Sequence, residues 1–249
     1  PETRVSGDSE EQQTADNGET TTGTYHAHYP RSWFVYNGFF QTELTCEQFS
    51  PIWAGCYQEN SYPVAIFEWT AYNPTDAPIT LSIMLTWQNM VGWFANAIKN
   101  PQVQVRDDGS PVYEYQPRWG DSTGSFNQWI VDHFRVGCLL DRVRLHDSEA
   151  VATVRGASEI QEGEGQLCFS TVTNPSMEVF YHSRWNASGN GAEVWGTFAN
   201  DGSLGDIQDE TPAAPGEQIA AAIAIRFTVR PGKTRKIPFI LSWDFPVSE

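Results

Sequence analysis

From Tyr25 onward, short runs of aromatic and β-branched residues alternate with clusters of Pro, Gly, Asn and Asp. Residues 79–87 show the pattern most clearly, because Ile, Leu, Ile, Leu and Trp occupy every second position and Thr, Ser, Met and Thr fill the positions between. An alternation with a period of two places each set on one face of a β-strand. The pattern therefore predicts strands with one buried face and one wetter face.

Two pairs of runs are joined by short turn segments. Residues 64–73 and 79–87 flank an Asn-Pro-Thr-Asp connection, and residues 219–229 and 236–243 flank a turn with Pro-Gly at 230–234. Proline, glycine and aspartate suit tight turns between strands. Both pairs are predicted to be hairpins.

Further strands are expected between these pairs and before them. The alanine-rich residues 220–225 have the propensity of a helix, but Ile223, Ile225 and Phe227 alternate and a Pro-Gly turn follows, which favours a strand. The other expected strands lie near residues 25–36, 43–49, 112–115, 136–144, 166–172 and 178–184.

Two segments do not follow the strand pattern. Residues 120–134 are a candidate for one short helix, and residues 186–217, rich in Gly, Asn and Asp, are predicted to form a long loop. No tandem repeat of fixed period is visible. Many short strands with few helices predict an all-β fold, a two-sheet antiparallel β-sandwich with long loops.

The first 24 residues differ from the rest of the chain. They contain six acidic residues, one arginine and only Val5 as a sizeable apolar residue. Little there offsets the entropy cost of ordering. We expect residues 1–24 to form a disordered acidic tail or an exposed loop and residues 25–249 to form one sandwich domain.

Composition and charge narrow the classes of partner. A 40% apolar content with 10 Trp, 9 Tyr and 14 Phe supports a folded core. The formal net charge of −16 argues against nucleic acid and anionic membrane surfaces, since both require basic patches. No apolar run near 18 residues and no leader pattern occurs, so neither a transmembrane segment nor a signal peptide is expected.

The four cysteines are sparse for a domain of this size. Cys46, Cys56, Cys138 and Cys168 form no C-x-x-C pair, which favours reduced thiols and a cytoplasmic location. A single disulfide between Cys46 and Cys56 remains an alternative.

No pair of carboxylates in the sequence makes a convincing catalytic dyad. Glycosidases hold two carboxyl groups roughly 5–9.5 Å apart. Glu43 and Glu47 share a strand face, but four residues at about 3.3 Å each separate their backbones by about 13 Å. Glu162 and Glu164 lie in a Gly-rich loop that cannot preorganise a pair. Solvated surface charge is the default interpretation, and no catalytic residue is assigned to this chain.

Metal, nucleophile and cofactor motifs are also missing from the sequence. His26 and His28 would point the same way from a strand, but no third ligand is evident. No Gly-x-Ser-x-Gly elbow occurs, and Gly189-Asn-Gly191 lacks the lysine of a phosphate loop. We expect no metal site and no cofactor.

Tryptophans are the most informative remaining residues. Most aromatic rings on strands fill a core, but five tryptophans fall outside the clearest strands and are candidates for contact with a ligand or a neighbouring domain. These are Trp93, Trp119, Trp129, Trp185 and Trp195.

Several ordered motifs resemble the N-terminal domain of glycoside hydrolase family 116. The motifs are YPRSW at 29–33, LTCEQFSP at 44–51, YQENSYPV at 57–64, NPTD at 73–76, SIMLTWQN at 82–89 and WDFP at 243–246. This family includes the bile-acid β-glucosidase, or non-lysosomal glucosylceramidase, and bacterial β-glucosidases; the chain looks most similar to cyanobacterial members. The resemblance covers residues 25–249, whereas a glycine-rich segment of the family is replaced at the front by the acidic tail, so one early strand is expected to be missing.

The resemblance implies a β-sandwich packed on a C-terminal (α/α)6 domain that carries the nucleophile and the acid/base carboxylate. That helical domain is absent from this chain, so no catalytic position can be carried over. The parent enzyme is expected to hydrolyse β-glucosides or glucosylceramide with retention, and this chain alone is expected to be inactive.

Two roles remain open for the chain itself. One is structural support of the helical domain, with contact residues expected at the end of residues 79–87, namely Gln88, Asn89 and Trp93, and at Trp119 and Trp129. Loop residues at strand ends are free to serve a neighbour. The other role is a carbohydrate-binding module that stacks sugars on exposed aromatic rings.

Overall fold

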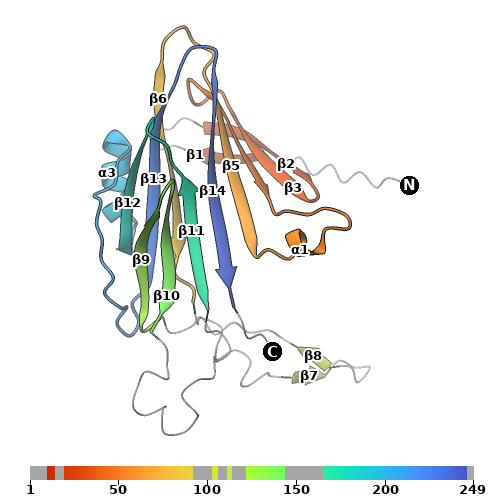
Figure 1. Ribbon diagram of the computed structural model, residues 1–249, viewed down its shortest axis with the longest axis vertical. Coiled ribbons are helices and arrows are strands. Elements are labelled where there is room, and N and C mark those ends of the chain that lie inside the picture. Colours follow the sequence, from red (N-terminus) through yellow and green to blue (C-terminus); the bar gives the residue numbers. More distant parts are fainter. Residues whose placement is uncertain are drawn as a thin grey trace.

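The computed structural model describes residues 10–14, 20–91, 103–105, 111–113, 122–143 and 165–245, and it describes side chains within 23–91, 122–143 and 165–245. Antiparallel strands make up most of this part of the chain, arranged in two main sheets (Figure 1). The prediction of an all-β sandwich is confirmed.

The larger sheet, called sheet A, has nine strands in the order β1-β2-β3-β4-β5-β14-β11-β10-β9. Their bounds are Glu10–Thr14 (β1), Thr20–His28 (β2), Arg31–Asn37 (β3), Glu43–Phe49 (β4), Val64–Tyr72 (β5), Ser125–Asp132 (β9), Arg135–Arg142 (β10), Gln166–Val172 (β11) and Thr234–Asp244 (β14).

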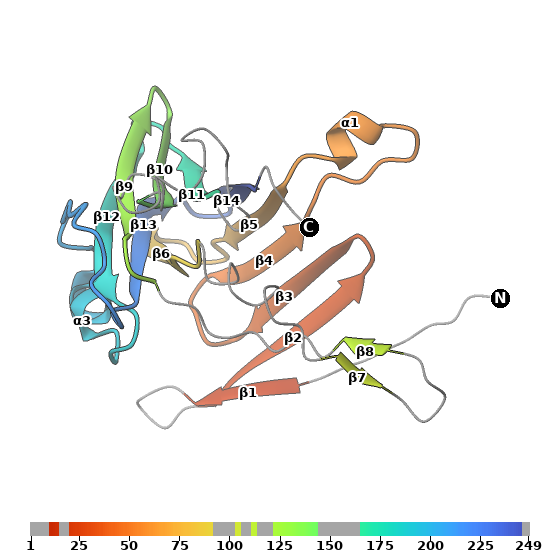
Figure 2. The same ribbon diagram turned by 90° about the horizontal axis from the view of Figure 1, so that it is seen from below.

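The smaller sheet, called sheet B, has the order β12-β13-β6, with bounds Met177–Asn186, Ile219–Val229 and Ile79–Gln88. A separate pair joins β7 (Val103–Val105) to β8 (Pro111–Tyr113). Figure 2 shows sheet A curving away from sheet B, so that β2, β3 and β4 extend beyond it. The smaller sheet therefore covers only part of the larger one.

The main core lies between the two sheets. Ile223 and Ile225 of β13 face Phe169 and Phe239 of sheet A, and all four are fully buried. Burying one such side chain contributes about 1.5–3 kcal/mol relative to leaving it exposed. The strict alternation of β13 is confirmed as a strand pattern despite its four alanines.

The two connections predicted as hairpins are arches between the sheets. Strand β5 pairs with β4 and β14 in sheet A, whereas β6, the next strand in the chain, pairs with β13 in sheet B. The chain likewise crosses from β13 in sheet B to β14 in sheet A. The prediction of two hairpins is wrong, because period-two alternation marks a strand but does not say which sheet it joins.

Asn73 joins the two arches at one end of the sandwich. Its Nδ2 donates to the carbonyls of Ala77 and Val229, and its backbone N–H donates to the carbonyl of Lys233. Its Oδ1 accepts hydrogen bonds from the backbone N–H and the hydroxyl of Thr75. The side chain is fully buried, so these bonds replace all of its contacts with water.

A helix covers the outer face of sheet B. Helix α3 (Ala192–Asp201) lies between two glycines in the left-handed conformation, Gly191 and Gly202. Its Val194 packs on Ala222 and Ala224 of β13, whose small side chains leave room for the helix. The prediction of one long loop over residues 186–217 is wrong here, because glycines at both ends masked a ten-residue helix.

The expected helix in residues 120–134 is also wrong, since this region forms β9. Every second residue of this strand points toward the core, namely Ser125, Asn127 and Trp129. Because two of these residues are polar, the sequence shows no apolar alternation here. The strands predicted at 43–49 and 166–172 have the observed bounds.

The N-terminal part of the chain contains more β-strands than the sequence predicted. Residues 25–36 span two strands, β2 and β3, joined at Tyr29 and Pro30. Glu10–Thr14, placed by the sequence in a tail or loop, forms β1 and pairs with β2. Gly23 of β2 lies under the ring of Phe34, where a Cβ atom would collide with that ring.

Candidate interdomain site

The strand ends that lie opposite the two arches gather at one end of the sandwich, which we call the loop end. Five strand termini define it: Val64, Gln88, Ser125, Gln166 and Asp244. Figure 1 shows the loop end at the bottom, below β9, β10, β11 and β14. The expected contact segment after β6 therefore starts here.

Asn89 connects the two sheets at the loop end. Its Nδ2 lies 3.0 Å from three acceptors, namely the carbonyls of Phe126 and Asp141 and the Oδ1 of Asn127. Its Oδ1 accepts a hydrogen bond from the backbone N–H of Val91. The side chain is 0% exposed. Its polar atoms are thus used within the sandwich.

Gln88 lies beside it and is half-buried. Its Nε2 donates to Oε1 of Gln218 over 3.0 Å, so it ties the end of β6 to the residue that precedes β13. Trp93 and Trp119 lie outside the described residues.

Trp129 of β9 stacks on Tyr181 of β12 with ring centroids 4.2 Å apart and an interplanar angle of 9°. It packs against the main core and joins sheet A to sheet B. Trp185 packs against the α3 cluster, whereas Trp195 on α3 is 58% exposed. Of these three tryptophans, only Trp195 presents most of its surface.

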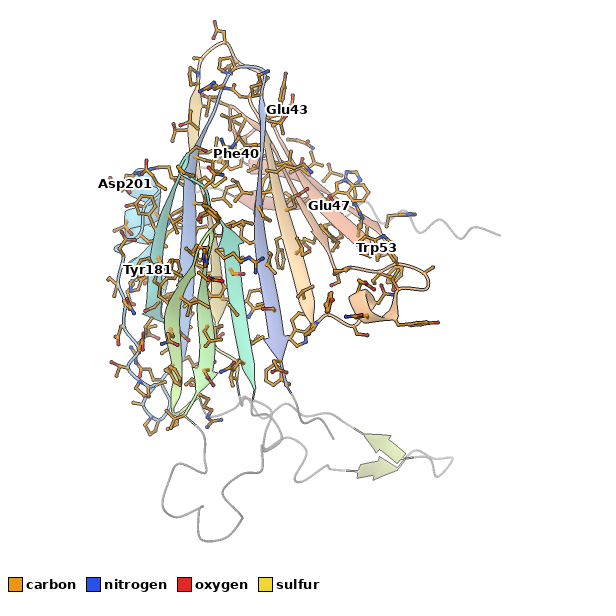
Figure 3. All side chains as sticks on the ribbon, in the orientation of Figure 1. Phe40, Glu43, Glu47, Trp53, Tyr181 and Asp201 are labelled. Carbon is orange, nitrogen blue, oxygen red and sulfur yellow. The ribbon has the colours of Figure 1, made fainter. Side chains whose placement is uncertain are left out.

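An apolar projection that was not predicted from the sequence lies at the loop end. The connection between β4 and β5, residues 50–63, extends from sheet A and contains the short helix α1 (Tyr57–Asn60); we call it the arm (Figure 3). Trp53 is 60% exposed and Tyr57 is 83% exposed, and Ile52 and Tyr62 are also exposed. The signal was present in the sequence, because Glu59 is the arm's only charged residue.

Hydrogen bonds fix the shape of the arm. Asn60 accepts from the backbone N–H of Trp53 at 2.6 Å and donates to the carbonyl of Trp53 at 2.7 Å. Ser61 caps the carbonyl of Tyr57, and at the base of the arm Ser50 donates to the carbonyl of Val64. No residue of α1 is buried. The arm is therefore internally bonded but displays its apolar side chains.

The described glutamates of β4 and β5 lie on the sheet as surface charges. Glu43 and Glu47 lie apart along β4 (Figure 3). Glu47 instead lies opposite Glu68 of β5, a cross-strand pair that the linear sequence does not reveal. Arg31 binds Glu47 at 2.8 Å and Lys236 binds Glu68, which offsets the repulsion between the two carboxylates. Glu162 and Glu164 lie outside the described residues.

A shallow hollow of about 340 Å³ lies between α3 and sheet B. Its cation, Arg226, is bound to the carboxylate of Glu178 and to the backbone carbonyl of Asp201. The ring of Phe180 lies under the guanidinium at 4.6 Å. The positive charge of Arg226 in this hollow is therefore already paired within the protein.

The histidines and cysteines with described side chains show no cluster of metal-binding geometry. His26 stacks on Trp33 at 5.4 Å. All four cysteines are free, with Cys46 and Cys138 buried and Cys56 exposed. Burial raises the pKa of the Cys46 thiol to about 12. The alternative of a Cys46–Cys56 disulfide is therefore not realised in the structure.

Neither helix in the described ranges has the length and hydropathy to cross a membrane.

Comparison with known proteins gives one family match. The family described as beta-glucosidase 2, glycosyl-hydrolase family 116 N-term, matches residues 2–249.

Two solved structures are similar over 91% of this chain at 6% identity. One is a putative kojibiose phosphorylase from human microbiome, with a TM-score of 0.29 and 18% of its length covered. The other is the heparan sulfate lyase HepC from Pedobacter heparinus, with a TM-score of 0.36 and 22% of its length covered. The chain spans about a fifth of the length of each.

Proposed function

We propose a function from one premise: the chain belongs to the N-terminal domain family of glycosyl-hydrolase family 116. On this premise the chain is the non-catalytic β-sandwich of a β-glucosidase and supports a separate (α/α)6 catalytic domain. The match over residues 2–249 is the observation that carries the proposal.

The geometry of the acidic residues supports a non-catalytic role. Retaining glycosidases need a nucleophile and an acid/base carboxyl group about 5 Å apart, both free to react. Glu47 and Glu68, which lie opposite each other on neighbouring strands, are each bound to a cation on a sheet face. We place the two reacting carboxylates on the helical domain, where they hydrolyse β-glucosides or glucosylceramide with retention.

The loop end is the proposed surface toward that domain. Strand β14, the last element of the described residues, ends there at Asp244. Residues 88–93 start there as well, with Gln88 at the surface and Asn89 anchoring the segment to both sheets. Trp93, Trp119 and Trp129 stay our candidates for residues that position this contact, Trp129 through its stack on Tyr181.

The test compares the two-domain enzyme with this chain alone. The two-domain protein should release nitrophenol from an aryl β-glucoside and yield β-glucose first, as seen by proton NMR, whereas this chain alone should release none. Turnover by this chain alone, or an inactive two-domain enzyme, would contradict the proposal.

The exposed rings of Trp53 and Tyr57 favour one alternative, a carbohydrate-binding module. Affinity electrophoresis in gels with soluble β-glucan separates the two functions. Retardation of this chain relative to a gel without glucan would support the alternative, and unchanged migration would support the structural role.

We also propose a cytoplasmic location, supported by four free cysteines. Thiol titration of the unfolded, unreduced protein should find four reactive thiols. A smaller number would indicate disulfide formation and contradict a reducing compartment.

A further inference from the structure

We propose that the arm, residues 50–63, is the element of the sandwich that docks on the helical domain following β14. This inference rests on the proposed function and names a contact that was not among the residues predicted from the sequence. Its occupant is the downstream domain of the same polypeptide.

The chemistry of the arm is that of an interface core. Trp53 and Tyr57 are mostly exposed, Ile52 and Tyr62 of the same segment are also exposed, and Glu59 is its only charged residue. Interface cores are enriched in Trp and Tyr and depleted of charged residues. Exposed apolar groups of this kind mark binding surfaces when they cluster.

The arm is built to present these side chains rather than to bury them. Asn60 holds the backbone of Trp53 through both of its polar atoms, so the loop keeps one shape without a core of its own. A pre-shaped loop loses less conformational entropy when it binds.

The position of β14 identifies the occupant. The backbone N–H of Trp243 donates to the carbonyl of Pro63, the last residue of the arm, over 3.0 Å. Trp243 and Phe245, the last apolar side chains of this strand end, are themselves exposed. Strand β14 therefore ends directly beside the base of the arm, which favours the domain that follows β14 as the occupant.

Cys56 provides a built-in reporter for docking. Its thiol is exposed and lies between Trp53 and Tyr57, whereas Cys46 and Cys138 are buried. If the arm is docked, reaction of Cys56 with a small alkylating agent requires the interface to open. Mass spectrometry of the labelled peptide follows this residue separately from every other thiol.

The experiment uses the native two-domain enzyme and this chain alone. Cys56 should react at least about tenfold more slowly in the two-domain enzyme. The Trp53→Ser/Tyr57→Ser variant of that enzyme should recover most of the rate, because it removes the anchors but leaves Cys56 in place. Trp195→Ser is the matched control, since Trp195 is 58% exposed on α3, and it should leave protection unchanged.

Glucosidase activity of the same samples separates this inference from the proposed function. An active enzyme in which Cys56 reacts as fast as in the chain alone would overturn the docking proposal and leave the function intact. Protection that appears only with added β-glucan oligosaccharide would show a sugar-binding arm, and protection that grows with protein concentration would show a second copy on it. Either result would overturn docking on the helical domain.

Discussion

Among single residues, two buried asparagines hold opposite ends of the sandwich. Asn73 bonds the two arches to each other, and Asn89 bonds the end of β6 to β9 and β10. Both side chains are fully buried, so each lost partner would leave an unsatisfied polar group. These two side chains provide hydrogen bonds between the sheets at places where no strand of one sheet pairs with a strand of the other.

Replacing Asn89 should be far more damaging than replacing its neighbour. Asn89→Ala should lower the free energy of unfolding by about 2–4 kcal/mol, because the N–H of Val91 and several buried acceptors lose their partner. Gln88→Ala removes one half-buried contact to Gln218 and should cost about 0.5–1 kcal/mol. Urea denaturation measures both, and equal losses would contradict the role of Asn89.

A buried histidine makes stability depend on pH. Burial lowers the pKa of His182 below its ordinary value of 6.5, and Glu193 and Asp209 only partly offset this effect. The unfolded chain therefore takes up a proton first as pH falls. The stabilisation is complete above pH 6.5 and is lost progressively below it.

The check is urea denaturation at several pH values between 7.5 and 5.5. The wild-type free energy of unfolding should fall across this range, and His182→Gln should show a flatter dependence. Hydrogen-bonded carboxylates such as Asp209, whose pKa Thr211 holds below 3.8, lose their contribution only at more acidic pH. If the free energy of unfolding depended on pH equally in the wild type and in His182→Gln, the pH dependence would come from other groups.

At the scale of elements, β13 packs on both faces. One face carries Ile223, Ile225 and Phe227 into the main core, and the other carries Ala222 and Ala224 under α3. Branched and aromatic side chains fill the space between sheets, whereas alanines allow the helix to approach. The two faces therefore tolerate different changes.

Enlarging the alanine face should be costly. Ala224→Leu inserts extra methylene groups under Val194 and should destabilise the fold by about 1–3 kcal/mol. Thr228→Leu, at an exposed position of the same strand, is the control; it removes only an exposed hydrogen bond to Thr80 and should cost no more than about 0.5–1 kcal/mol. Thermal unfolding of the two variants makes the comparison, and a similar melting temperature would contradict the packing of α3 on β13.

The strands could be predicted from the sequence better than their partners. Alternation located β6, β11 and β13, because one face of each is apolar. It could not show that β5 and β6 lie in different sheets, since a turn and an arch use the same Pro and Asp residues. The contacts of the candidate site were more difficult to predict than the strands. In the sequence Asn89 looks like a surface polar residue, because its hydrogen-bond partners on β9 and β10 come together only in the folded protein.

At the scale of the whole molecule, the two sheets are interleaved along the chain. Sheet A takes strands from both ends of the sequence, and β14 lies between β5 and β11 in its middle. The core residues Ile237, Phe239 and Leu241 come from this last strand. The sandwich thus depends on its final element for both hydrogen bonds and packing.

Removing β14 should abolish folding rather than weaken it. A chain ending at Val229 loses pairing on both sides of the gap and three buried core residues. Near-UV circular dichroism should lose its fixed aromatic signal, and a hydrophobic dye should bind. A shortened chain that retained a sharp melting transition would contradict this dependence.

The central position of β14 also has a consequence during synthesis. The ribosome makes Thr234–Asp244 after every other strand described here, so the segments that form β5 and β11 lack a pairing partner until it emerges. Open edges are prone to pair with other nascent chains. Slower elongation before residue 234 should therefore lengthen the time during which these segments can pair with other chains.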